Sequence, residues 1–138
     1  MYVQANFSHI VVGQVGIRCK HCAHNPQARH ASAATYYPGS LNVLYQSAQN
    51  MAQHHLCCPN PTSSSRCTSI PESLRSALQD LREHKRRASA GKNYWRESAL
   101  KIGIVEQSSA NDGNNIDGHD GLRYDPSQAQ LSLLTGSF

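Results

Sequence analysis

The most constraining feature of this chain is the order of its cysteines and histidines. Cys19 and Cys22 lie two residues apart at the end of the stretch IVVGQVGIRCKHC. A histidine pair, His54 and His55, follows after a long spacer. Three more cysteines come after the pair: Cys57, Cys58 and Cys67. A C-x2-C pair, a long spacer, a histidine and a further cysteine is the ligand order of a structural zinc site.

The chemistry of zinc explains why this order is useful. Two thiolates on one tight turn bind one side of a tetrahedron, and a histidine and a thiolate from a helix end close the other side. His55 is the predicted ligand because it continues the apolar face of the preceding helix, whereas His54 is rotated by about 100°. Cys58, three residues after His55, is the predicted fourth ligand, and Cys67 is the alternative. Four protein ligands leave no open position, so the predicted Zn²⁺ is structural.

Two other interpretations of the cysteine pair compete with zinc. A redox C-x-x-C pair belongs at a helix N-terminus in a thioredoxin-like context, but this pair follows a predicted strand. Buried thiols without a ligand role are the third interpretation, because free cysteine is often buried. The start of the chain has no signal-peptide pattern, so we expect an intracellular location, in nucleus or cytoplasm, where structural disulfides are rare. The odd number of cysteines, five, also argues against a disulfide framework.

Two extended segments and a long helix are predicted in the first half of the chain. The stretches IVVGQVGIRC (10–19) and AATYYP (33–38) are rich in β-branched or aromatic residues and indicate strands. Ser40 is the predicted N-cap of a helix over 41–55, in which apolar residues recur every three or four positions.

Two further helices follow a loop rich in proline and serine. The second helix is predicted to begin at a capping box formed by Ser69 and Glu72. The third is predicted over 94–102, with Trp95 on its inward face and Gly103 at its end.

From Glu106 onward the composition becomes polar, acidic and rich in glycine. The chain is therefore predicted to be a small zinc-stabilised α+β domain over residues 9–105. It would comprise a two-stranded β-hairpin and about three helices, followed by a flexible acidic tail over 106–138. The start inside the first strand region suggests the loss of an N-terminal extension.

Charge is unevenly distributed along the chain. Through Val105 there are twelve Lys or Arg against four Asp or Glu, and from Glu106 onward one against five. A basic body predicts a polyanion as partner, because basic side chains neutralise phosphates. The predicted nucleic-acid-binding residues are Lys85, Arg86, Arg87, Lys92 and Arg96. The alternative is a module for protein–protein interaction or regulation, whose binding would depend less on salt.

No catalytic constellation is found in the sequence. It has no Ser-His-Asp order, no phosphate loop and no H-x-E with P-C-x-x-C of a zinc deaminase. The four acids before residue 106 leave few candidate general bases. We therefore expect no enzyme activity and no small-molecule substrate. No run of about 18 apolar residues is present, so a membrane partner is not expected either.

Several motifs carry a resemblance to a protein family. The segments VGQVGIRCKHCAH, YYPGSLNVLYQSAQNMAQHH, CTSIPESLR, YWRESALKIGIVE and GLRYD resemble a large family of uncharacterised cysteine/histidine proteins from diatoms and related algae. The resemblance covers about residues 9 to 124. It implies a zinc-finger-like domain with Cys19, Cys22 and His55 as ligands, and no known activity. Cys58 matches the family's distance from the histidine, whereas Cys67 matches its Cys-x-x-[Ile/Leu]-Pro context, as if the loop between them were inserted.

Overall fold

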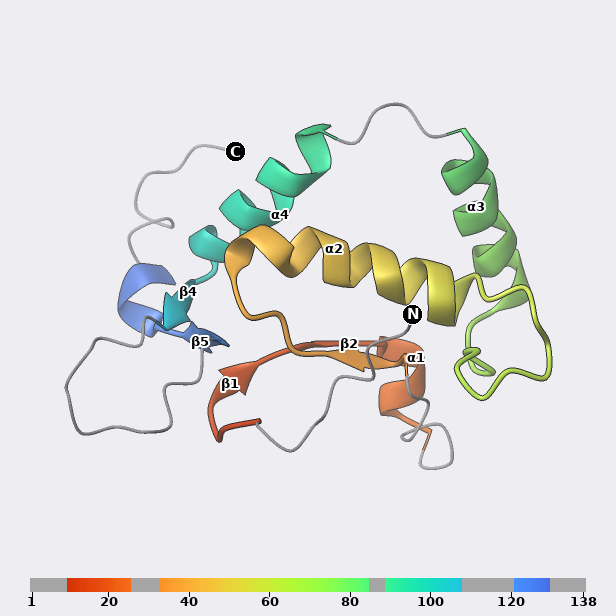
Figure 1. Ribbon diagram of the computed structural model, residues 1–138, viewed down its shortest axis with the longest axis horizontal. Coiled ribbons are helices and arrows are strands. Elements are labelled where there is room, and N and C mark those ends of the chain that lie inside the picture. Colours follow the sequence, from red (N-terminus) through yellow and green to blue (C-terminus); the bar gives the residue numbers. More distant parts are fainter. Residues whose placement is uncertain (1–9, 26–32, 85–88, 108–120, 130–138) are drawn as a thin grey trace.

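The structure is a computed structural model that describes residues 10–25, 33–84, 89–107 and 121–129 (Figure 1). Within these ranges no helix is long and apolar enough to span a membrane. The elements in chain order are β1 (Gln14–Val15), β2 (Ile17–Arg18), α1 (Lys20–Ala23), β3 (Thr35–Tyr36), α2 (Leu41–Met51), η3 (Ala52–Leu56), α3 (Glu72–Glu83), α4 (Ser89–Lys101), β4 (Ile104–Gln107) and β5 (Gly121–Tyr124). The predicted α+β class is confirmed.

The predicted two-stranded pairing is present as β2 and β3. They are antiparallel, with Ile17 opposite Tyr36 and Arg18 opposite Thr35. Gly16 divides the predicted first strand into β1 and β2, which belong to different sheets. A Cβ added at Gly16 would lie 2.8 Å from the Tyr36 carbonyl oxygen and 2.8 Å from the Tyr37 ring. Glycine therefore permits the close approach of the two strands at this point.

A second sheet corrects the expectation of a flexible tail. β5 lies between β1 and β4 and is antiparallel to both. Leu122, in the middle of β5, is only 1% exposed, because it packs against Leu41, Leu44 and Ala99. The boundary expected between residues 105 and 106 therefore falls inside β4. The other residues of the expected tail, 108–120 and 130–138, lie outside the described residues.

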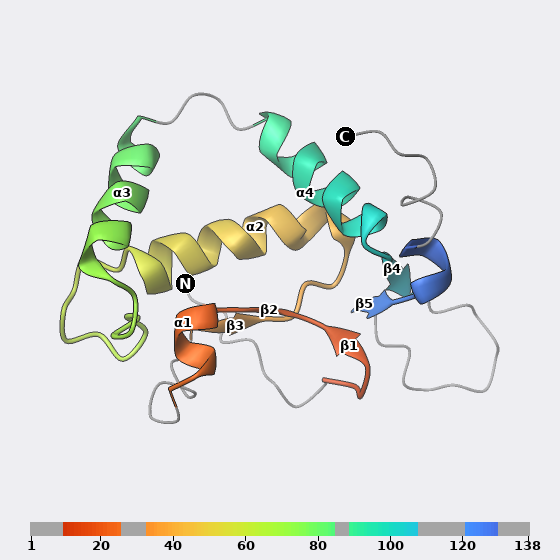
Figure 2. The same ribbon diagram turned by 180° about the vertical axis from the view of Figure 1, so that it is seen from behind.

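Helix α2 joins two buried clusters. Figures 1 and 2 show that α2 crosses the molecule, with β4 and β5 near its N-terminal end and α1 and α3 near its C-terminal end. Leu41 and Leu44 belong to the cluster at the sheet end. Met51 belongs to the second cluster, which contains Cys19, Cys22 and Cys67. The apolar face of α2 that the sequence predicts thus contributes residues to the buried clusters at both ends of the molecule.

The two later helices differ in detail from expectation. α4 packs along α2 and begins at Ser89, before the predicted start. Trp95, expected on the inward face, keeps 36% of its surface exposed. α3 begins after Pro71 at the N-cap position, and no capping bond from Ser69 is found. The Ser69 hydroxyl oxygen instead accepts a hydrogen bond from Asn25 Nδ2 at 3.2 Å.

Candidate metal centre

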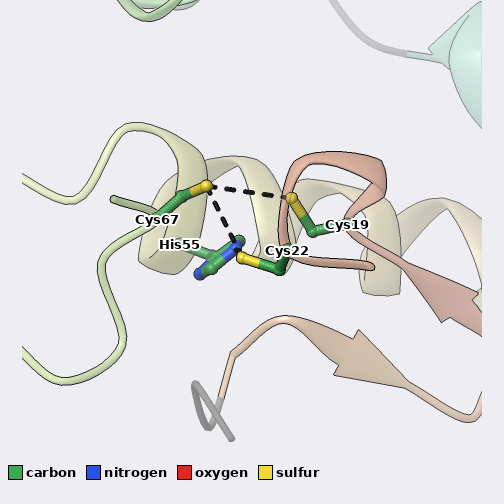
Figure 3. Close-up of side chains that lie close together, drawn as sticks. All are labelled: Cys19, Cys22, His55 and Cys67. Carbon is green, nitrogen blue, oxygen red and sulfur yellow. Dashed lines mark hydrogen bonds between the residues drawn. The ribbon is translucent and has the colours of Figure 1, made fainter. Parts of the chain in front are cut away.

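Four buried side chains with metal-ligating atoms meet at the C-terminal end of α2. They are Cys19, Cys22, His55 and Cys67, none more than 3% exposed. Their Sγ atoms and the nearest imidazole nitrogen all lie within 4.8 Å of one another. Figure 3 shows the four side chains pointing toward one another from the α1 turn, from η3 and from the segment before α3.

The first two residues of the cluster are placed by a tight turn. Cys19 follows β2 and is the N-cap of α1, and its N–H donates to the Ala34 carbonyl on the neighbouring chain segment at 2.8 Å. The Ala23 N–H closes the turn onto the Cys19 carbonyl at 3.1 Å. Residues three apart in a helical turn lie on the same face. The C-x2-C spacing therefore presents the Cys19 and Cys22 sulfur atoms to the same point.

The third ligand is placed by a widened helical turn. After Met51 the α-helix continues as the π-type turn η3, in which the Cys57 N–H donates to the Ala52 carbonyl at 2.8 Å. Such turns are often found at functional sites. Here the turn brings His55 to 0% exposure, whereas its neighbour His54 stays outside the cluster. The helix-face prediction of His55 agrees with this placement.

The imidazole of His55 is held in the tautomer that a metal ligand needs. Its Nδ1 lies 2.5 Å from the Ser65 carbonyl oxygen. A carbonyl can only accept, so Nδ1 carries the proton and Nε2 presents its lone pair to the cluster. Nε2 lies 3.3 Å from Cys22 Sγ. Burial, with the nearby Arg75 charge as a smaller cause, lowers the pKa of His55 and keeps the ring neutral.

The fourth residue of the cluster is Cys67. The chain leaves η3, loops out and returns, and the Cys67 N–H donates to the His55 carbonyl at 2.9 Å. Cys67 Sγ lies 3.9 Å from Cys19 Sγ and 3.7 Å from Cys22 Sγ. Tetrahedral zinc, with Zn–S of about 2.3 Å and Zn–N of about 2.0 Å, requires S–S edges of about 3.8 Å and S–N edges of about 3.5 Å. The two sulfur–sulfur distances, and the 3.3 Å between Cys22 Sγ and His55 Nε2, lie close to these edges.

The predicted fourth ligand, Cys58, does not join the cluster. It is buried, but its thiol faces the Asn60 carbonyl at 3.8 Å. The reason is local: the helix ends at Cys57, so Cys58 no longer follows the face that carries His55. The Arg66 guanidinium donates to the Cys58 carbonyl and holds this turn away from the centre. The alternative named from the Cys-x-x-Ile-Pro context, Cys67, takes the position.

Burial makes the Cys19 and Cys22 thiols difficult to ionise without a nearby cation. Burial raises the pKa of Cys22 to about 12, and the thiol of Cys67 adds to the effect. Burial likewise raises the pKa of Cys19. A neutral thiol is a poor ligand, and a bound divalent cation supplies the charge that stabilises the thiolate. A redox-active pair, in contrast, typically has a lowered thiol pKa, so the burial of Cys19 and Cys22 favours the metal-ligand interpretation over the redox interpretation.

Sequence reasoning missed one residue that lies beside the centre. Arg75, in α3, is only 3% exposed and donates to the carbonyls of Leu56 and Cys67 at 2.5 and 2.6 Å. The sequence feature that could have indicated its burial is its position one turn before Leu78, on the same face of the helix. An arginine on such a face more often reaches solvent, so the signal was weak.

The predicted basic surface is described only in part. Lys92 and Arg96 are exposed and lie one turn apart on α4. Lys85, Arg86 and Arg87 lie outside the described residues.

Comparison with known proteins adds no further assignment. No family model, no curated protein and no solved structure matches the chain. A function is therefore assigned from the chemistry of the four clustered side chains.

Proposed function

We propose that the chain is a zinc-binding module in which Cys19, Cys22, His55 and Cys67 hold one structural Zn²⁺. The observation that supports this most is the tetrahedral spacing of four buried donor atoms. Three thiolates and one imidazole suit zinc in a tetrahedral site, and four protein ligands leave no position for a substrate. The four residues come from three segments of the chain: the α1 turn with Cys19 and Cys22, η3 with His55, and the segment before α3 with Cys67. The ion would therefore connect these three segments.

Metal analysis of two matched variants tests the proposal. Purified parent protein should contain one zinc per chain. Cys67→Ser should lose it, whereas Cys58→Ser, which removes a buried thiol outside the cluster, should keep it. Retention of zinc by Cys67→Ser, or loss from Cys58→Ser alone, would contradict this ligand set. Parent protein that binds no zinc on titration would refute the proposal itself.

A second function, nucleic-acid binding, is proposed for the basic surface on α4. Lys92 and Arg96 are exposed and lie one turn apart on the same face of α4. Two cations on one helix face can contact phosphates of a nucleic-acid strand. The exclusion of enzyme activity, the intracellular location and the resemblance to the diatom and algal family stay predictions.

Salt dependence separates nucleic-acid binding from the protein-interaction alternative. The affinity for a labelled single-stranded RNA should fall steeply as salt rises, and Lys92→Gln with Arg96→Gln should reduce the logarithmic slope by roughly 1.4. Lys101→Gln, at the far end of the same helix, is the control. RNA affinity that does not respond to salt, or no RNA affinity at all, would favour a protein partner.

A further inference from the structure

Arg75 is a buried charge at the edge of the candidate metal centre. Within the described residues it is the single buried side chain of permanent charge. Its guanidinium uses all three nitrogens: Nη1 donates to the Leu56 carbonyl at 2.5 Å, Nη2 to the Cys67 carbonyl at 2.6 Å, and Nε to Glu72 Oε2 at 3.1 Å. Burying a cation is unfavourable unless its hydrogen bonds are satisfied and its charge is compensated.

The two carbonyls that Arg75 binds belong to the segments that carry the later ligands. Leu56 directly follows His55, and Cys67 is itself a ligand residue. The same two segments already meet through the hydrogen bond from the Cys67 N–H to the His55 carbonyl. The planar guanidinium therefore fixes both main chains at once, in a fork geometry that lysine cannot reproduce.

The charge of Arg75 also suits a loaded site. Three thiolates and one divalent cation leave a net charge of −1, which is unfavourable in a buried environment. Glu72, the carboxylate bound to Arg75, is largely exposed and therefore solvated. Because the guanidinium contacts both segments that carry the later ligands, it is able to compensate the charge of a metal–thiolate group.

Helix α3 has little else to hold it against the domain. Of its residues, all of which are described, Arg75 is the one that is buried. Leu78 packs partly against the cysteine cluster, but Leu74 and Leu81 are exposed. Figures 1 and 2 show α3 beyond the C-terminal end of α2, away from the sheets. The docking of α3 thus depends on the same contacts that surround the ligands.

We propose that Arg75 is a positioning residue of the metal centre that couples metal binding to the docking of α3. This inference rests on the proposed zinc site. Because coupling between two events is reciprocal, metal binding strengthens α3 docking, and a docked α3 strengthens metal binding. Residues that orient ligands from outside the coordination shell typically change metal affinity by 10- to 100-fold when they are replaced.

The test compares Arg75→Gln and Arg75→Lys with Arg82→Gln, a replacement on the same helix outside the metal centre. Zinc affinity is measured by competition with a chromophoric chelator, and backbone amide exchange is measured at saturating zinc. Arg75→Gln should still bind one zinc, but about 10- to 100-fold more weakly. Its α3 amides should lose protection, while those of η3 keep theirs. Arg75→Lys, which keeps the charge, should bind zinc with an affinity between those of Arg75→Gln and the parent.

The outcomes separate this inference from the proposed function. Parent affinity and parent α3 protection in Arg75→Gln would overturn the role of Arg75 while leaving the zinc site intact. An equal loss in Arg82→Gln would overturn it as well, because the effect would then belong to the helix as a whole. A parent protein without zinc affinity would overturn both. If Arg75→Gln does not fold, the comparison is made with Arg75→Lys. Zinc affinity and α3 protection equal to those of the parent in Arg75→Lys would overturn the positioning role of Arg75.

Discussion

At the residue scale, Gly103 lies in the two-residue connection between α4 and β4. Its φ is +88°, and a Cβ there would lie 2.6 Å from the Asp125 carbonyl oxygen. Its own carbonyl accepts the Asp125 N–H at 2.7 Å, which anchors the end of β5. Gly103→Ala should therefore lower the free energy of unfolding by about 1–3 kcal/mol. Urea unfolding at saturating zinc measures the change.

The matched control for this prediction is Gly39→Ala. Gly39 precedes α2, its φ is not in the left-handed region, and nothing lies within 4 Å of an added Cβ. Its replacement should leave the free energy of unfolding unchanged or slightly higher. Equal effects of the two substitutions would show that the backbone at Gly103 adapts to a side chain.

The ligand residues predict the pH dependence of metal binding. The pKa values of Cys19 and Cys22 are raised above the ordinary thiol value of 9.0, and that of His55 is lowered below 6.5. Between these two limits the Cys19 and Cys22 thiols are protonated and the His55 imidazole is neutral. Metal binding through these two sulfur atoms must then release close to two protons per metal ion.

The consequence is that acid weakens metal binding and alkali strengthens it. The logarithm of the apparent affinity should rise with pH at a slope of at least about two between roughly pH 6.5 and 9, because Cys19 and Cys22 must both lose a proton. Chelator competition across this range measures the slope. Cys58→Ser is the control and should give the same slope, whereas a slope near one in the parent would contradict a ligand set that contains both Cys19 and Cys22.

At the residue scale the sequence predicted most of the site. The C-x2-C spacing identified Cys19 and Cys22, and helix periodicity separated His55 from His54. The choice between Cys58 and Cys67 was different. It depends on where η3 ends and on how the following loop brings Cys67 back to His55. The number of residues between His55 and each cysteine predicts neither. Arg75 was missed because burial of a charge depends on carbonyls that only the folded chain brings together.

At the element scale, helix α2 receives its N-terminal cap from another part of the chain. Ser40 occupies the N-cap position with extended backbone, but its side chain makes no capping bond. Instead the Leu41 N–H donates to Glu106 Oε1 at 2.7 Å. A carboxylate at this end of a helix accepts a free backbone N–H and interacts favourably with the helix dipole. Glu106, expected in the flexible tail, thus joins β4 to α2.

Replacing the Glu106 carboxylate by an amide should weaken this cap. Glu106→Gln removes the charge while keeping the shape, so the free energy of unfolding should fall by about 0.5–1 kcal/mol. Denaturant unfolding at low salt measures it, and added salt should reduce the difference. Glu97→Gln, on an exposed part of α4, is the control and should have little effect. A difference that does not change with salt would assign the effect to hydrogen bonding alone.

Elements with a long apolar repeat were predictable, and short ones were not. The face of α2 was correct because its burial follows the period of the helix. β5 has only four residues and pairs with β1, far away in sequence, so no local pattern marks it. The second helix was predicted correctly as α3, but Leu74 and Leu81 on it are exposed, because an apolar repeat does not show whether a neighbouring surface exists to cover it.

At the scale of the whole molecule, stability is shared between two unlike clusters. The cluster at the sheet end contains Leu41, Leu44 and Leu122 and is stabilised by apolar burial. The cluster at the other end is built largely from cysteines, with Met51 and small residues, and buries thiols of raised pKa. Ile17 packs against both clusters and α2 runs between them. The metal-site end should therefore depend on the ion far more than the sheet end does.

Removing the metal should therefore loosen the molecule from one end. With a strong chelator present, the amides of Cys19 and Cys67, which donate to Ala34 and His55, should exchange at least about tenfold faster. Amides in the ladder of β4 and β5 should keep most of their protection, because Leu122 stays buried among leucines. Hydrogen exchange resolved by residue measures both. In Cys67→Ser the metal-site end should be loose already, and the chelator should change nothing further. An equal loss of protection at both ends of the parent would show instead that α2 transmits metal binding through the whole domain as one cooperative unit.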